Sequence, residues 1–98
     1  MRFEFHPEGL EEYREAGHYY ARQQSGLDLR FIACIEEAIG LILEDPYRWR
    51  PFDEDVRRCL TRVFPYGILY TVESDFVLIV AVAHCSREPG YWKHRIGG

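Results

Sequence analysis

Residues 76–83 read FVLIVAVA, the longest uninterrupted apolar run in the chain. A run rich in valine and isoleucine predicts a strand that is covered on both faces, because neither face receives polar side chains. The run falls far short of the ~20 apolar residues that a membrane-spanning helix needs. It therefore predicts the central strand of a soluble fold, with other elements packed on either side.

Three more strands are predicted around this one. Residues 66–73 lead into it through a two-residue turn at residues 74–75. A strand over residues 56–63 comes before Pro65, which cannot donate a hydrogen bond to a sheet ladder. At the start of the chain, residues 2–6 alternate polar and apolar side chains, which is typical of a short half-buried strand. Together these segments predict a small, mostly antiparallel sheet.

Residues 8–24 and 28–44 show the apolar spacing of two helices. The first has one apolar stripe, and the second is apolar over more than one face, with Asp28 as its expected N-cap. The linker at residues 25–27 is short enough to predict an antiparallel helical hairpin. The buried stripe expected for the first helix consists of Leu10, Tyr13 and Tyr20.

The remaining segments complete the predicted architecture. Residues 45–55 contain two prolines and no apolar period, so a loop is expected there. Residues 88–95 are expected to form one helical turn. The order of strand, two helices and three strands predicts an α+β fold, with the helical hairpin packed on the sheet. Residues 1–98 are expected to form a single domain, because a chain this short has little room for a second core.

The composition of the 98-residue chain is that of an ordinary globular protein, with 47% hydrophobic and 29% charged residues. Three cysteines, an odd number, argue against a disulfide scaffold. No pair of them has the spacing of a zinc site, so we expect neither a metal nor another cofactor. The N-terminal stretch turns acidic where a signal peptide would be apolar. These features predict a cytoplasmic protein.

Charge is unevenly distributed along the chain. Residues 1–46 contain ten acids and four arginines, a balance of −6, whereas residues 47–98 contain eight bases and six acids, a balance of +2. Lys93 is the only lysine. Arginine's planar guanidinium is suited to carboxylates and phosphates. The basic half could face an acidic protein segment or a phosphate backbone, and ordinary surface ion pairs remain the simpler interpretation.

Two C-terminal segments, residues 62–70 (RVFPYGILY) and 81–95 (AVAHCSREPGYWKHR), resemble toxins of the RelE/ParE superfamily from type II toxin–antitoxin systems. The shared pattern is FPY with a second tyrosine shortly after it, and then AVAH followed by R, P, YW and R. Residues 5–7 (FHP) and residues 45–46 (DP) are also similar to the family. The likeness covers nearly the whole chain, and the order of elements expected here agrees with the family's fold.

The resemblance implies a growth-inhibiting toxin that forms a hetero-oligomer with a cognate antitoxin. The antitoxin's tail is expected to lie across the sheet and the groove beside the helices. Relatives act in two ways: RelE-like toxins cut mRNA in the ribosome, whereas ParE-like toxins, of the plasmid stabilisation type, poison DNA gyrase and are not nucleases. No membrane partner is implied.

The residues favour one of these activities. Metal-free RNA cleavage needs a base, an acid and cations around the phosphate, which RelE-like toxins supply largely with sheet lysines and arginines and a C-terminal tyrosine or histidine. Here the predicted strands contain no lysine and the net charge is −4, although contact with ribosomal RNA depends on neutralising phosphates. Two helices of roughly 17 residues, about 25 Å long, also resemble ParE-like toxins more. We expect a gyrase poison, with a ribosome-dependent mRNA endonuclease and a non-toxic antitoxin-binding module as alternatives.

Candidate site residues lie in the predicted strand at residues 56–63, just after the apolar run 76–83, and in the tail. The catalytic residues of a RelE-like enzyme would be His84, Arg87 and Tyr91. The residues expected to bind the target or the antitoxin are Arg57, Arg58, Arg62, Trp92 and Arg95. Alternation along a strand can place neighbouring arginines on opposite faces. Each candidate also has a structural interpretation, because tail aromatics often anchor a turn and edge-strand charges discourage aggregation.

Overall fold

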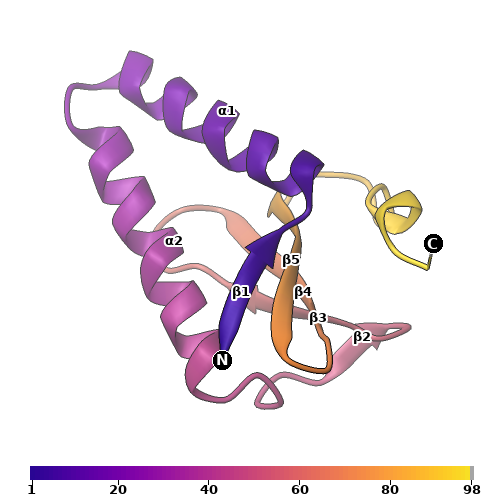
Figure 1. The fold of residues 1–98 in the computed structure, drawn as a ribbon. Helices are drawn as coiled ribbons and strands as arrows, with labels where there is room; N and C mark the ends of the chain where they lie inside the picture. The colour runs from indigo at the N-terminus through magenta and orange to yellow at the C-terminus, as the bar shows by residue number, and fades with distance from the viewer. Residues whose placement is uncertain (98) are drawn as a thin grey trace.

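The computed structural model of the chain describes residues 1–97. It consists of two helices, a five-stranded sheet and a short 3-10 turn near the C-terminus (Figure 1). In chain order the elements are β1 (Arg2–Phe5), α1 (Pro7–Gln23), α2 (Leu27–Glu44), β2 (Pro51–Asp53), β3 (Val56–Leu60), β4 (Tyr66–Val72), β5 (Phe76–His84) and η1 (Lys93–Arg95). This confirms the predicted α+β architecture, including the long pair of helices.

The sheet has the strand order β1-β5-β4-β3-β2. β5 is hydrogen-bonded on both sides, parallel to β1 and antiparallel to β4. The Glu73 N–H donates to the Phe76 carbonyl (2.8 Å) across the two-residue turn that joins β4 to β5. Val77, Ile79 and Val80 on β5 are fully buried. The apolar run is therefore an interior strand covered on both faces, as the sequence predicts, but it lies second in the sheet, and the middle strand of the five is β4.

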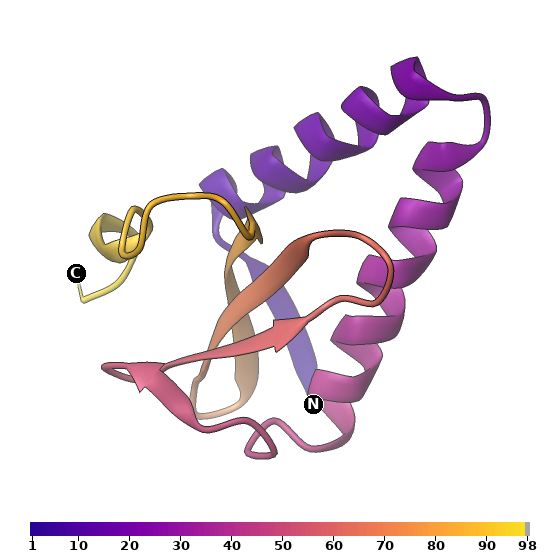
Figure 2. The ribbon, with the colours of Figure 1, turned by 180° about the vertical axis from the view of Figure 1, so that it is seen from behind.

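Different parts of the chain cover the two faces of the sheet. On one face, Phe31 and Ile35 of α2 lie in a buried cluster with Tyr70 and Ile79. On the other face, Trp92 of the C-terminal tail packs with residues of β3, β4 and β5. The helices diverge from their turn like the arms of a V (Figure 1). The view from behind shows the tail and α2 on opposite sides of the sheet (Figure 2).

The first turn of α1 approaches β5 closely. Pro7 starts the helix, where its missing N–H costs nothing, and His6 Nδ1 accepts a hydrogen bond from the Glu8 N–H (3.1 Å). A Cβ atom added at Gly9 would lie 2.9 Å from the Val80 carbonyl oxygen. Glycine at this position therefore sets the distance between α1 and β5.

Two details of the helices differ from the prediction. The buried residues of α1 are Gly9 and Ala16, because small side chains allow the close approach to β5. The second helix begins at Leu27, and Gly26, in the left-handed region with φ 84°, takes the N-cap position expected for Asp28. Glycine adopts that conformation without strain and turns the chain directly into α2. The stripe predicted to be buried is instead half-buried, and its members are Leu10, Tyr13 and Tyr20.

Two strand boundaries also differ from the prediction. β3 ends at Leu60, because residues 61–65 turn away from the sheet and connect to β4. The segment predicted to be a loop, residues 45–55, contains the three-residue strand β2 (Pro51–Asp53), which pairs with β3 at the sheet edge in an irregular register. A strand this short shows no alternation in sequence, and proline is tolerated at a sheet edge.

The turn between β3 and β4 contains an unusual backbone conformation. Val63 has φ 72°, and the Phe64 N–H donates to the Arg62 carbonyl (2.8 Å) across it. A hydrogen bond over one residue with positive φ is the rare, strained form of the γ-turn. A β-branched residue strongly disfavours this region, and such strain costs about 1–3 kcal/mol.

We predict that Gly9→Ala destabilises the chain, because its Cβ meets backbone that cannot move aside. Overpacking of this kind costs about 1–3 kcal/mol, which outweighs the helix-propensity gain of about 1 kcal/mol from replacing glycine. Gly17→Ala is the matched control on the same helix, since within residues 1–97 nothing lies within 4 Å of its added Cβ. Thermal unfolding should show a lower Tm for the first variant and an unchanged or higher Tm for the second. Equal shifts would contradict the close approach.

Candidate functional site

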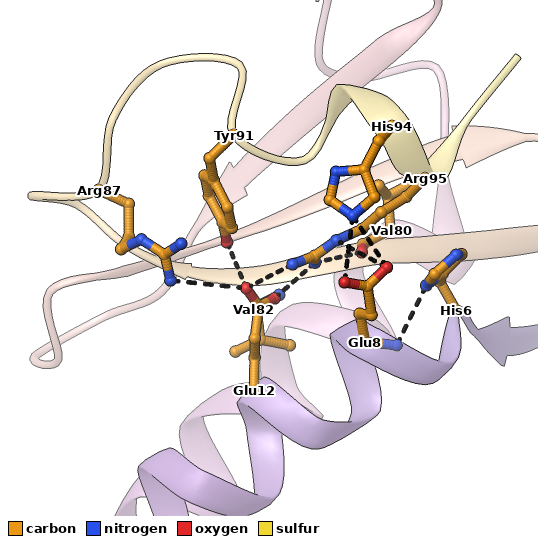
Figure 3. Close-up of polar contacts among 9 residues, drawn as sticks. All are labelled: His6, Glu8, Glu12, Val80, Val82, Arg87, Tyr91, His94 and Arg95. Atoms are coloured by element: carbon orange, nitrogen blue, oxygen red, sulfur yellow. Dashed lines mark hydrogen bonds and ion pairs between the residues drawn. The ribbon is translucent and has the colours of Figure 1, made fainter.

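The C-terminal tail is tied to α1 mainly through the carboxylate of Glu12 (Figure 3). Arg95 donates to it twice, from Nη1 to Oε1 (2.9 Å) and from Nη2 to Oε2 (3.0 Å). The Tyr91 hydroxyl donates to Oε2 as well (2.6 Å). The side chains of Glu12 and Arg95 are only 15% and 5% exposed. A two-pronged arginine–carboxylate pair shielded from water is geometrically specific and fixes the tail.

The same pair completes the hydrogen bonding of β5. β1 ends at Phe5, so in the described part of the chain β5 has no neighbouring strand on that side beyond Ile79. There the Val82 N–H donates to Glu12 Oε1 (3.1 Å), and Arg95 Nη1 donates to the Val80 carbonyl (3.0 Å). Buried backbone groups need such partners. Glu12 and Arg95 therefore take the place of a missing strand.

Further contacts strengthen this latch, by which we mean Glu12, Tyr91 and Arg95. The Arg87 guanidinium carbon lies 3.8 Å from the centroid of the Tyr91 ring, in cation–π geometry. Burial, together with the hydrogen bond to Glu12, raises the pKa of the Tyr91 hydroxyl well above its ordinary value. The hydroxyl therefore keeps its proton and donates a hydrogen bond to Glu12.

A second polar contact lies beside the latch, between the tail and the first turn of α1. His94 Nε2 lies 2.9 Å from Glu8 Oε2, and this hydrogen bond lowers the pKa of Glu8. Arg95 Nε lies 3.9 Å from the same oxygen and is buried without a hydrogen bond to any of the described residues. The tail thus contacts α1 at Glu8 and Glu12, one helical turn apart.

The arginines predicted to bind a partner point in different directions. Arg57 Nη1 donates to the Trp49 carbonyl, and its guanidinium lies 5.0 Å from the Tyr47 ring centroid. Arg58 is exposed, and its side chain crosses Gly67. Arg62 lies past the end of β3, in the turn, and not on a strand as the sequence predicts. Of these three arginines, Arg58 and Arg62 are therefore the exposed ones.

His84 and Trp92 both make contacts that stabilise the fold. His84 Nδ1 accepts a hydrogen bond from the Ser86 N–H (3.0 Å), and its ring meets Tyr66 edge-on. Trp92 is 3% exposed and packs against the face of the sheet opposite the helices. Beside it lies a hollow of about 190 Å³, whose lining includes Arg58, Leu60, His84 and Arg87.

A second region of interest lies along the helices. Two hollows of about 330 and 360 Å³ meet at Tyr13, between α1, α2 and β1. Their lining is mainly apolar and includes two glycines, Gly17 and Gly40, whose missing side chains leave open space. We call these two hollows together the helix groove.

Two kinds of site were also sought within residues 1–97. No helix there combines the length and the apolar character that crossing a membrane requires. Nor does any group of three or more histidine, cysteine, aspartate or glutamate side chains gather there in a way that could hold a metal ion.

Sequence reasoning missed Glu12, which is the centre of the latch. The helix dipole favours acids near a helix N-terminus, so an acid in the first turns of α1 indicates nothing special in the sequence. The signal that could have revealed it is its position between Gly9 and Ala16, three and four residues away. Small residues at that spacing mark a helix face in close contact with another element.

Comparisons with known proteins agree with this architecture. A solved chain described as "Chromosomal ParDE TA system from P. aeruginosa" superposes with a TM-score of 0.72 at 12% sequence identity. The match covers 86% of this chain and 95% of that one. At this identity the likeness shows a shared fold. No curated protein sequence matches the chain.

The family follows from the sequence profile that the chain matches. Residues 3–89 match the family described as "ParE toxin of type II toxin-antitoxin system, parDE". The chain therefore belongs to the ParE toxin family. This confirms the ParE-like side of the resemblance seen in the C-terminal motifs.

We predict that Glu12→Gln releases the tail, because it leaves the Arg95 charge buried without its partner. Breaking a buried ion pair costs about 3–5 kcal/mol, and the Tm should fall accordingly. The fluorescence of Trp92 should shift to the red as the tail leaves the sheet. Glu11→Gln, at the exposed neighbouring position on α1, is the control and should change neither quantity. Native Tm and native fluorescence in the Glu12→Gln variant would show that the latch does not hold the tail.

Proposed function

We propose that this chain is a growth-inhibiting toxin that acts on DNA gyrase and is neutralised by a cognate antitoxin. Membership of the ParE family supports the proposal. The observation that carries it is that polar groups of the tail are already hydrogen-bonded within the chain. Tyr91 and Arg95 are engaged by Glu12 inside the chain, and the pKa of Tyr91 is raised. Groups held in this way are poor acids or bases for an RNA substrate, which favours a binding toxin.

An mRNA endonuclease remains the alternative with a specific observation in its favour. Arg58, His84 and Arg87 line the same hollow on the tail side of the sheet, so two cations and a titratable ring lie near one another. The acidic net charge of −4 argues against docking on ribosomal RNA. Gyrase, by contrast, would be contacted as a protein surface, and a toxin acting on it would work in the cytoplasm.

For the antitoxin, we propose the helix groove as the main docking surface. Its lining of Phe5, Tyr13, Ile32 and Leu43 offers half-buried apolar side chains along both helices. An antitoxin segment with regularly spaced apolar residues could bury these side chains further. Apolar anchors of this kind supply most of the affinity at protein interfaces.

We predict that inducing the toxin alone in bacteria stops DNA synthesis before protein synthesis. Thymidine and methionine incorporation, followed side by side after induction, measure the two. His84→Gln serves as the discriminating variant, because it removes the imidazole that lines the hollow. A gyrase poison should keep the same order of events in this variant. Protein synthesis failing first, and recovering in the variant, would establish the endonuclease instead. Unimpaired growth would leave the non-toxic binding module.

We predict that Gly40→Arg weakens antitoxin binding by about tenfold or more, since it fills the helix groove with a charged side chain. Gly40→Ala is the matched control, because its Cβ meets nothing within 4 Å among residues 1–97. Titration calorimetry with the cognate antitoxin should show a loss of affinity only for the arginine variant. Equal affinities in both variants would place the antitoxin elsewhere.

A further inference from the structure

The turn between β3 and β4 presents apolar side chains to solvent from a strained backbone. Val63, at the centre of the strained γ-turn, is 80% exposed. Leu60, at the end of β3, is 57% exposed. We call Leu60, Arg62 and Val63 the tip. Strain at Val63 lowers stability, and the exposed valine buries nothing in return. Strain of this kind is typically retained where it serves a function.

The surrounding residues hold the tip in one conformation. The Thr61 N–H donates to the Tyr66 carbonyl (2.9 Å), and Thr61 Oγ1 donates to the Phe64 carbonyl (2.8 Å). Phe64 itself is buried, edge-on against Tyr20 of α1 (4.9 Å between ring centroids). The tip is therefore held by the hydrogen bonds of Thr61 and by the buried ring of Phe64. A surface fixed in this way loses little entropy when it binds a partner.

The chemistry of the tip defines the kind of partner that it fits. Arg62 has a side chain that is 79% exposed, and its ion pair with Glu37 is long, at 3.8 Å. Arg58 is exposed, and together with Leu60 it lines the hollow beside Trp92 on the tail side of the sheet. The exposed Val63 side chain, next in the chain to the accessible guanidinium group of Arg62, complements an apolar depression with a carboxylate at its rim. Arginine pairs with carboxylates more specifically than lysine does.

We propose that the tip is the surface through which this toxin grips its protein target, with Val63 in an apolar depression of the target and Arg62 on a carboxylate at its rim. This inference rests on the proposed function for the identity of that target, DNA gyrase. We assign the tip to the target and not to the antitoxin because the two surfaces lie at different strands. The helix groove, which we propose for the antitoxin, includes β1, whereas the tip follows β3. β5 and β4 separate those two strands in the sheet. The view from behind brings β3 and its turn in front of β1 (Figure 2).

The test uses two variants that change stability and shape in different ways. Val63→Gly removes both the strain and the side chain, so its Tm should rise by about 4 °C. Val63→Ala keeps a Cβ in the positive-φ region but removes the two methyl groups, so its Tm should stay near that of the wild type. Both should raise the concentration needed to inhibit purified gyrase by about tenfold or more. Arg62→Ala should do so as well.

Matched controls come from α2. Leu29 is another large exposed apolar side chain, and Arg30 is the exposed arginine beside it. The variants Leu29→Ala and Arg30→Ala remove an exposed apolar side chain and an exposed guanidinium group away from the tip. Both should inhibit gyrase like the wild type. A variant that is more stable than the wild type and yet less active cannot owe its loss to misfolding.

The outcomes separate this inference from the proposed function. Full gyrase inhibition by both Val63 variants would overturn the role of the tip. If the variants instead lose neutralisation by the antitoxin, or change self-association in sedimentation, the tip is an antitoxin or dimer surface and the inference is wrong. If the wild type leaves gyrase untouched, the gyrase proposal fails, and growth inhibition by the same variants then decides the role of the tip. Weaker growth inhibition by both would support it, and undiminished inhibition would overturn it.

Discussion

The paired side chains of Glu12 and Arg95 hold together three parts of this small fold. They join α1 to the tail, and they satisfy the backbone of β5 where β1 has ended. The need arises from length, because β1 is four residues and β5 is nine. A longer first strand would satisfy the sheet without side chains. Here a helix and the tail perform that task, so the tail has a structural role even though it is on the surface.

This constraint bears on function. Family resemblance makes Tyr91 a candidate for catalysis and Arg95 a candidate for binding a partner, but both are engaged by Glu12. Their engagement leaves the exposed guanidinium groups of Arg58 and Arg62 as the more accessible contacts. The chain therefore offers a surface for binding a protein more readily than a set of groups for cleaving RNA. Its acidic helical half and its more basic sheet half divide the molecule in the same way.

Much of the fold could be predicted because it depends on local patterns. The run 76–83 is apolar on both faces, and the two helices show clear periodicity, so the order of elements along the chain and the helix lengths followed from short segments. The errors lie where the chain departs from regular periods. β2 is three residues long, and β3 is cut short by a turn that requires a left-handed valine. No pattern in the sequence signals a β-branched residue in that conformation.

The site was harder to predict because its central contact joins residues that are 83 positions apart. Arg95 and Tyr91 were found through the family motif, whereas Glu12 resembled any acid at a helix start. The most direct test of this account is supercoiling by purified gyrase in the presence of the purified chain. We predict inhibition at near-stoichiometric concentration, with cleaved DNA accumulating and no cutting of ribosome-bound mRNA. Unchanged supercoiling together with cut mRNA would contradict the account.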